Sequence, residues 1–320
     1  MNEIAIKKQT DLMRYDIEKM IGSFIRSQDV KETTKENYRK CLRQFFLWIR
    51  KNDISNPTRE DILAYKESMR ERLSPYSLSL YMVAVRKFFE WIEGMKVYPN
   101  VARGIKGAKG SNQHSREPLT PGQARELMKT IKIDTTLNGL RDFAMVNLMI
   151  STGLRDIEVK RANIEDISQK GGEAILWIQG KGRDNKDQFV ILTERTHKPI
   201  REYLKAREYK SGSEPLFCSH SNHNYRKRLT THSISRIAKK RLREIGLDSR
   251  KLTAHSLRHS AITFSLLGGA TIQEAQALGR HANINTTLIY AHNIDRIKQA
   301  PERKIDALLD NEEEFDDIEK

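Results

Sequence analysis

The residues with the clearest chemical potential lie between positions 253 and 292. His255 and Arg258 are three positions apart, and Tyr290 follows His281 by nine residues. A helix places residues three apart on one face, so His255 and Arg258 can converge on one small anion. A tyrosine held beside such a pair could attack a phosphorus atom. The rest of the chain must supply the other groups that this chemistry needs.

Cleavage of a phosphodiester by a tyrosine needs fixed cations for the non-bridging oxygens and a proton donor for the leaving alkoxide. Neighbouring cations are expected to ease the loss of the tyrosine's own proton. Arg155, after a glycine turn, and Arg258 can supply the fixed charge, and Lys181 lies in a glycine-containing loop. Each has an ordinary alternative: Arg155 can pair with Glu158, and Lys181 can be a solvated turn residue. We expect His259 to make a hydrogen bond rather than to act in chemistry.

The composition describes a polar chain with a large excess of positive charge. Its 320 residues include 57 Lys and Arg against 42 Asp and Glu, a net charge of +15. Such an excess points to a polyanionic partner, most often nucleic acid, with salt-dependent binding. A merely solvated basic surface is the alternative. The acidic stretch DNEEEFDDIEK at the end is read as a solubility tail or as a mimic of DNA.

Other partners and compartments receive little support from the sequence. The apolar runs are shorter than the ~18 residues that span a bilayer, and the N-terminus lacks the apolar segment of a signal peptide. We therefore expect a cytoplasmic protein without a membrane partner. Cys41 and Cys218 fit no pattern of metal ligands, so we expect reduced packing residues and no metal site.

Helical periodicity, together with glycine- and proline-containing turn signals, divides the chain into two domains. The predicted parts are an N-terminal extension (1–15), an all-α domain (16–102), a basic linker (103–118), a second domain (119–300), and a helix end with an acidic tail (301–320). Three short strands are expected in the second domain, at 163–167, 174–179 and 187–192. Capping boxes are expected at Thr33 with Glu36, Thr120 with Gln123, and Thr271 with Glu274. The predicted fold class is mainly α with a small antiparallel β-sheet.

Together and in this order, the candidate residues resemble the active site of the tyrosine recombinase (phage integrase) family. TGLRDIE resembles the first arginine box, GKGRDNKDQFVIL the lysine hairpin, AHSLRHSAIT the second arginine box, and GRHANINTTLIYAH the nucleophile box. TKENYRKCLRQFFLWI and SPYSLSLYMVAVRKFFEWI are similar to the family's SAM-like, four-helix core-DNA-binding domain. The resemblance covers about residues 16–300 and implies an α+β catalytic domain after the helical one.

The resemblance implies a mechanism. Tyr290 would attack the scissile phosphate and form a 3′-phosphotyrosyl link, while Arg155 and Arg258 hold the non-bridging oxygens. Lys181 would be the general acid toward the 5′-oxygen. Because the bond energy stays in the protein–DNA ester, the family's reaction needs no metal or nucleotide cofactor.

Further roles follow from the same resemblance. His255 would accept a proton or bind the phosphate, and His281 would donate a hydrogen bond to the phosphate. Glu158 would orient Arg155 or His255 without taking part directly.

Two departures from the family's pattern affect these assignments. The usual Leu-Gly-His of the third box reads Leu-Gly-Arg-His here. The spacing of nine to the tyrosine selects His281, which leaves Arg280 as an additional DNA contact. Arg183 and Lys186 share the hairpin with Lys181, so the general acid could be displaced to one of them.

The resemblance also implies partners. These are a double-stranded DNA core site and a homotetramer that exchanges strands through a Holliday junction, with a monomer or weak oligomer when free. A helix expected at 294–309 would pack on a neighbouring protomer. Contacts to DNA are expected from basic residues of both domains and the linker: Arg39, Lys40, Arg43, Lys87, Lys106, Lys109, Arg183 and Arg280.

Several readings stay open at this point. Helices that begin near residue 16 predict a layout like that of two-domain Xer-type, plasmid or transposon resolvases. Integration, excision and dimer resolution are all compatible with it. A type IB topoisomerase or telomere resolvase would use the same chemistry, and a non-catalytic DNA-binding regulator would use only the basic surface.

Overall fold

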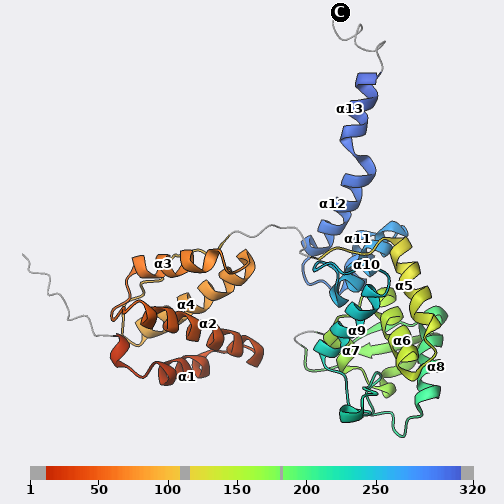
Figure 1. Cartoon of the computed structure of the whole chain (residues 1–320), viewed down its shortest axis with the longest axis horizontal. Helices are drawn as coiled ribbons and strands as arrows, with labels where there is room; N and C mark the ends of the chain where they lie inside the picture. The colour runs from red at the N-terminus through yellow and green to blue at the C-terminus, as the bar shows by residue number, and fades with distance from the viewer. Residues whose placement is uncertain (1–11, 109–115, 181–182, 311–320) are drawn as a thin grey trace, which may run out of the picture. The chain divides into compact units, whose positions relative to one another are not determined.

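The structure is a computed structural model that describes residues 12–108, 116–180 and 183–310. Two compact units account for the chain, residues 1–112 and residues 113–320 (Figure 1). Both are mainly helical, and the second also contains a three-stranded antiparallel sheet. The predicted fold class is confirmed. In the described part of the chain, every helix is too short or too polar to cross a membrane.

The described part of the first unit, residues 12–108, contains four α-helices. They are α1 (Ile17–Ser27), α2 (Glu32–Lys51), α3 (Arg59–Arg70) and α4 (Pro75–Gly94), preceded by a 3₁₀ turn, η1 (Leu12–Arg14). Asp16 caps α1, Thr58 caps α3, and Ser74 caps α4 with Pro75 at the first helical position. The capping box expected at Thr33 is wrong, because α2 begins two residues earlier than predicted, at Glu32, and has Lys31 at its N-cap.

Aromatic side chains form the centre of the first unit's core. Phe45 lies edge-to-face with Tyr65 of α3 and with Phe89 of α4, at ring-centroid distances of 5.1 and 5.9 Å. Phe88 makes the same kind of contact with Phe24 of α1 at 5.7 Å. All five rings are fully buried. Each edge-to-face pair contributes about 0.5–1.5 kcal/mol beyond its buried area, so the four helices are held as one body.

The segment predicted as a linker is docked at its described ends. Ile105 is buried in the first unit's core, and the Ser79 hydroxyl donates to the Ala108 carbonyl at 2.9 Å. At the other end, the Glu117 backbone N–H donates to the Lys251 carbonyl at 3.4 Å within the second unit. Residues 109–115 lie outside the described residues.

The second unit is built around one central helix. Its elements are α5 (Pro121–Ile133), α6 (Leu137–Thr152), α7 (Asp156–Arg161), η2 (Ile164–Asp166), β1 (Ile167–Lys170), β2 (Glu173–Ile178), β3 (Gln188–Ile191), α8 (Glu194–Arg207), η3 (Asn222–Asn224), α9 (Thr231–Arg243), α10 (Ala254–Leu267), α11 (Ile272–Gly279), α12 (Asn285–Gln299) and α13 (Pro301–Asp310). Helix α6 packs against α5, α8, α9 and α10 (Figure 1). The capping boxes predicted for α5 and α11 are confirmed.

The sheet has the order β1-β2-β3, with both pairings antiparallel. Leu176 of β2 lies opposite Ile167 of β1 and Val190 of β3. Strands β2 and β3 fall within one residue of their predicted limits. The first strand was predicted too early, at 163–167. The Asp166 carboxylate accepts a hydrogen bond from the Asn163 backbone N–H at 2.6 Å, which closes a 3₁₀ turn where extended chain was expected.

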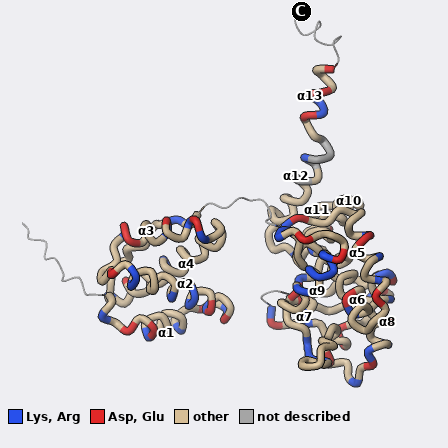
Figure 2. The backbone as a smooth tube through the Cα atoms, viewed as in Figure 1, with Lys and Arg blue, Asp and Glu red and all other residues tan. Residues whose placement is uncertain are grey.

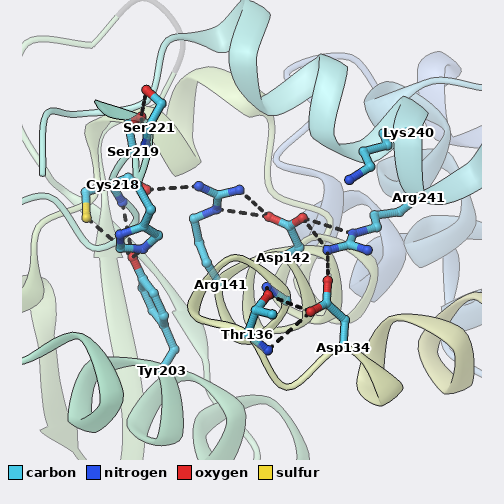
Figure 3. A network of polar contacts seen from close by, with 12 residues as sticks. Asp134, Thr136, Arg141, Asp142, Tyr203, Cys218, Ser219, Ser221, Lys240 and Arg241 are labelled. Carbon is cyan, nitrogen blue, oxygen red and sulfur yellow. Dashed lines mark hydrogen bonds and ion pairs between the residues drawn. The ribbon is translucent and has the colours of Figure 1, made fainter. Parts of the chain in front are cut away.

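A buried polar network fixes α6 to α9 and to the end of α5 (Figure 3). Arg141 and Arg241 both bind the Asp142 carboxylate, with N–O distances of 2.9 Å from each Nε. Arg241 also donates to Asp134 at 2.7 Å, and Arg141 donates to the Cys218 carbonyl at 3.4 Å. The network lies on one side of α6, and the C-terminal end of the same helix leads into the turn that carries Arg155.

The C-terminal segment contains two helices where one was expected at 294–309. Helix α12 ends at Gln299, Ala300 has a φ of 26°, and α13 begins at Pro301. Proline lacks a backbone N–H and disfavours α conformation in the residue before it, which explains the break. Helix α13 exposes Ile305, Leu308 and Leu309, with 55%, 40% and 62% of their surface accessible.

Candidate active site

A left-handed glycine places the first arginine. Helix α6 ends at Gly153, which has a φ of 62° and donates its N–H to the Met149 carbonyl at 3.0 Å. Leu154 is fully buried, and Arg155 is the N-cap of α7. The Glu158 carboxylate accepts from the Arg155 backbone N–H at 2.8 Å and from its Nη1 at 2.9 Å. Glu158 therefore orients both the backbone and the side chain of Arg155.

The second arginine joins two parts of the site. Arg258 lies on α10 and is 2% exposed. Its Nη1 donates to the Gly153 carbonyl at 2.5 Å, and its Nη2 donates to the Gly279 carbonyl at the end of α11. Burial lowers the pKa of Arg258, and the positive charges of Arg155 and Arg280 lower it further. An anion bound here would relieve that unfavourable electrostatic environment.

Arg280 differs most from its expected place. It was predicted as an additional DNA contact, but its side chain is only 7% exposed. Arg280 has a φ of 50° at the C-cap of α11, and this left-handed conformation turns the side chain inward. Its Nη2 donates to Glu158 at 3.0 Å and to the Gly153 carbonyl at 2.9 Å. Arg280 thus connects the nucleophile box to the first arginine box from within the protein.

The candidate active site contains more positive than negative charge. In the described part of the chain, Glu158 is the one acidic side chain bonded to Arg155, Arg258 or Arg280. Burial opposes ionisation of Glu158, yet the charges of Arg280 and Arg155 lower its pKa below the ordinary value. The carboxylate is therefore ionised at neutral pH. Three guanidinium groups and one carboxylate leave a surplus of positive charge that suits a phosphate.

His281 and Tyr290 follow from the turn after α11 and from α12. His281 Nδ1 and Thr287 Oγ1 are 2.9 Å apart, which fixes the imidazole. Its ring stacks on that of Tyr290, with centroids 6.2 Å apart and planes 15° from parallel. Tyr290 is 5% exposed and packs with Ile262 and Ala275. The structure thus brings His281 and Tyr290 together, as the sequence predicted.

The Tyr290 hydroxyl is hydrogen-bonded to His259 Nδ1. The His259 ring lies edge-to-face with that of His255, with centroids 4.8 Å apart, and His255 is exposed. Burial raises the pKa of Tyr290, although the charges of Arg258 and Arg155 oppose the rise. The expectation that nearby cations ease proton loss is confirmed for Arg258 and Arg155, but burial has the larger effect on the pKa of Tyr290.

Sequence reasoning missed this role of His259. It assigned the residue an ordinary hydrogen bond, and the partner of that bond is the candidate nucleophile. The available signal was the spacing of four between His255 and His259, which places both on one face of α10. The spacing alone does not identify the tyrosine, because α12 is brought to α10 only by tertiary packing.

The lysine hairpin borders a cavity of about 690 Å³ beside these residues. Arg155, Arg280 and His281 line it, together with Gly180 and Arg183 of the β2–β3 loop. Lys181 itself lies outside the described residues. The cavity is large enough for a phosphate and its adjoining sugar, and its lining is rich in hydrogen-bond donors.

The two alternative general acids of the hairpin have carboxylate partners. Lys186 Nζ is 2.7 Å from both carboxylate oxygens of Asp166. Arg183 forms an ion pair with Asp187. The Lys186 ammonium and the Arg183 guanidinium are therefore each held in an ion pair with a carboxylate.

The basic residues of the first unit that were expected to contact DNA differ in exposure and in ion pairing. Lys40 and Lys106 are exposed, and Arg39 is half-buried. Arg43 pairs with Glu18 at 2.9 Å, and Lys87 pairs with Glu90 at 2.9 Å. Lys109 lies outside the described residues. Helix α2 contains six Lys and Arg against two Glu, whereas α4 contains two basic and two acidic residues, so the positive charge of these two helices lies on α2 (Figure 2).

Two family patterns match the chain. The pattern of the phage integrase family matches residues 117–296, and that of the phage integrase N-terminal SAM-like domain matches residues 18–98. The XerC tyrosine recombinase of Pelobacter propionicus is 30% identical over 271 residues, which cover 82% of this chain and 85% of the relative. That of Herpetosiphon aurantiacus is 28% identical over 289 residues, covering 88% and 91%.

Solved structures share the fold. XerH bound to a palindromic difH substrate, after cleavage, has a TM-score of 0.71 at 22% identity and covers 89% of this chain and 83% of its own. A lambda integrase dimer bound to a COC′ core site has a TM-score of 0.67 at 15% identity, covering 86% and 76%. At these identities the likeness concerns the fold.

Proposed function

The chain belongs to the phage integrase family, and from this premise we propose that it is a site-specific DNA recombinase that cuts and rejoins DNA through Tyr290. One observation carries the proposal for the site: His281, whose ring stacks on that of Tyr290, lines one cavity together with Arg155 and Arg280. A tyrosine nucleophile beside a surplus of guanidinium groups suits transfer of a phosphodiester. The enzyme would be a tyrosine-type DNA strand transferase.

The reaction consists of two reversible transesterifications. The Tyr290 oxygen attacks the scissile phosphorus and forms a 3′-phosphotyrosyl ester, while the bond from phosphorus to the 5′-oxygen breaks. Lys181 gives a proton to the departing 5′-oxygen. A 5′-hydroxyl from the second DNA then attacks the ester and releases the tyrosine, so two rounds exchange both strands through a Holliday junction. The chemistry conserves one ester bond at each step and requires no external energy.

The arginines stabilise the charge that develops on the phosphate. Arg155 and Arg258 hold the non-bridging oxygens, for which a planar guanidinium is well suited. Glu158 holds Arg155 in the required orientation through two hydrogen bonds. Removing one fixed donor of this kind typically reduces the rate by about 10²–10³-fold.

The two histidines of the predicted set have different positions relative to the phosphate. His281 lines the cavity beside Arg155 and Arg280, where its ring can donate a hydrogen bond to the phosphate. His255 is exposed at the start of α10. It can contact the DNA phosphate or pass a proton to solvent.

The partner is double-stranded DNA with a core site, and the active assembly is a tetramer on that DNA. The net charge of +15 and the unmatched arginines support the DNA partner. In the first unit, Lys40 and Lys106 are exposed for phosphate contacts. Residues 294–309 are proposed to contact a neighbouring protomer, with Ile305, Leu308 and Leu309 of α13 as the apolar face.

Covalent trapping tests the proposal. A pool of end-labelled, nicked duplexes with randomised core sequences is incubated with the protein in EDTA and analysed on a denaturing gel. The intact protein should form a protein–DNA adduct, and Tyr290→Phe should form none. Tyr225→Phe removes an exposed hydroxyl elsewhere in the second unit and should leave the adduct yield unchanged. An adduct that survives Tyr290→Phe, or cleavage that requires Mg²⁺, would exclude this mechanism.

A further inference from the structure

The contact between His259 and Tyr290 is buried. The residues are 3% and 5% exposed, and their ring centroids are 5.3 Å apart. Ile262, three positions after His259 on α10, packs in one cluster with Tyr290 and Ala275 of α11. The imidazole Nδ1 is therefore held at the oxygen that would attack phosphorus, before any DNA is bound.

The attacking oxygen has to lose its proton in an unfavourable environment. Burial raises the pKa of Tyr290, so the phenol does not ionise near neutral pH without help. Arg258 and Arg155 stabilise the phenolate but cannot accept a proton. A positioned base with an ordinary pKa close to neutrality is what such a nucleophile requires, and imidazole meets that requirement.

We propose that His259 is the general base of the reaction, accepting the phenolic proton of Tyr290 on Nδ1 as the tyrosine attacks. This inference rests on the proposed recombinase function. The O–H bond of Tyr290 breaks, the new O–P bond forms, and the 5′-oxygen departs with its electron pair and is protonated by Lys181. His259 becomes an imidazolium. In the resealing step it returns the proton to the departing tyrosine oxygen, as microscopic reversibility requires.

The neighbouring histidines are placed for other tasks. His281 presents the face of its ring to Tyr290, and its Nδ1 is bonded to Thr287. His255 contacts the edge of the His259 ring and is exposed to solvent, so it offers a route by which His259 exchanges its proton with water. His259 Nδ1 is hydrogen-bonded to the nucleophilic oxygen.

The charges around the pair are compatible with an imidazolium once DNA is bound. The groups that face Tyr290 are Arg258 from α10, Arg155 from the α6–α7 turn and His281 from the α11–α12 turn. Arg258 and Arg155 oppose a further positive charge beside Tyr290. The scissile phosphate adds a negative charge beside these arginines, which offsets the positive charge that His259 gains when it accepts the proton.

The first test is His259→Asn in single-turnover cleavage of a nicked duplex recovered from the trapping experiment. The asparagine amide oxygen can still accept the tyrosine's hydrogen bond, but it cannot take the proton. Cleavage should fall by about 10²-fold or more, the usual contribution of a general base. DNA binding and thermal stability should change little. His223→Asn, at an exposed position of η3, is the matched control and should cleave like the intact protein.

The second test separates a base from a residue that only positions the tyrosine. Tyr290 is replaced by 3,5-difluorotyrosine, whose phenol loses its proton more readily, both in the otherwise intact protein and in the His259→Asn variant. The fluorines should raise cleavage at least tenfold in the His259→Asn background and change it little in the presence of His259. Should His259→Asn not fold, His259→Gln replaces it.

Two results would overturn the proposal. One is His259→Asn cleaving as fast as the intact protein, and the other is no gain from fluorination in that background. Either result leaves adduct formation by Tyr290, and hence the recombinase function, unaffected. Absence of any adduct with the intact protein would instead count against the function itself.

Discussion

The second unit contains two buried arginine clusters whose charges are balanced in opposite ways. The closed cluster consists of Arg141, Arg241, Asp134, Asp142 and Glu244, and every guanidinium in it meets a carboxylate (Figure 3). The site cluster consists of Arg155, Arg258, Arg280 and Glu158, in which three guanidinium groups share one bonded carboxylate. The arginines of both clusters are mostly buried, and the clusters differ in the number of carboxylates that pair with those arginines.

The pKa shifts follow this difference. Burial opposes the charge of Arg241, but hydrogen bonds to Asp134 and Glu244 outweigh it and raise the pKa. Burial also opposes the charge of Arg258, and the neighbouring Arg155 and Arg280 add to that effect, so the pKa falls. The positive charges of the closed cluster are neutralised without a ligand. Those of the site cluster need an added anion, which is the role we propose for the DNA phosphate.

This contrast separates structural arginines from ligand-binding ones. Removing one partner of a buried ion pair leaves an unpaired charge, which typically costs about 3–5 kcal/mol of stability. Removing a cation from a cluster that has too few carboxylates should cost much less stability. In the folded state, ion pairs offset only part of the free energy of burying that cation. Substitutions in the closed cluster should therefore lower stability more than activity, and substitutions in the site cluster should lower activity more than stability.

The largest effect on activity is expected for Arg258→Gln. Loss of a fixed guanidinium at the phosphate should reduce single-turnover cleavage by on the order of 10³-fold, or about 4 kcal/mol of transition-state stabilisation. The free energy of unfolding should change far less than that. Covalent adduct formation and urea denaturation measure the two quantities. A variant that is strongly destabilised yet cleaves normally would contradict the proposed difference between the two clusters.

Arg241→Gln should show the reverse behaviour. It leaves the buried Asp142 and the half-buried Asp134 with one cation fewer, so the free energy of unfolding should fall by about 3 kcal/mol. Cleavage per folded molecule should stay within a few-fold of the intact protein. Urea denaturation gives the stability, and active-site titration by the adduct gives the folded fraction. Lys240→Gln, next to it but largely exposed, is the control and should be nearly neutral.

Glu158→Gln tests the single carboxylate of the site cluster. Loss of charge-assisted hydrogen bonds to Arg155 and Arg280 should cost roughly 1.5–3 kcal/mol at pH 7. Because the folded-state pKa of Glu158 is lowered, its contribution is present above the ordinary pKa of a glutamate and is lost as pH falls through the lowered value. The difference in stability between the two proteins should therefore shrink on acidification below about pH 4.3. A difference that stays constant with pH would show that ionised Glu158 is not its source.

The smallest effect is expected for Arg280→Gly. Glycine adopts the φ of 50° without strain but loses the ion pair with Glu158, so stability should change by no more than about 1 kcal/mol. Arg280→Ala loses the same ion pair and keeps the strain, so it should be less stable than the glycine variant by about 1 kcal/mol. Thermal unfolding of the pair measures this. Equal stability would mean that the backbone strain is negligible.

Much of the fold follows from local signals. The capping boxes of α5 and α11 and the prolines at the starts of α4 and α5 mark helix ends that the structure reproduces. Local signals failed where a side chain competed with the expected element. Asp166 closed a 3₁₀ turn in place of a strand, and Pro301 divided the last predicted helix.

The sequence by itself determined which residues are candidates for the proposed chemistry. Arg155, Arg258, His281 and Tyr290 are recognisable from residue type and spacing, because a helix face and a fixed number of residues decide which groups can meet. The predicted role of Lys181 stays a prediction, since that residue lies outside the described part of the chain.

Only the tertiary structure decided how those groups are held. A basic residue beside a predicted DNA contact is normally assigned to the surface, but the left-handed conformation of Arg280 turns its side chain onto Glu158. Likewise, the contact between His259 and Tyr290 depends on the packing of α12 against α10, across 31 positions of sequence. The spacing of residues along the sequence predicts neither the sign of φ at a non-glycine residue nor the partner of a buried histidine. Both are set by which surfaces the folded chain brings together.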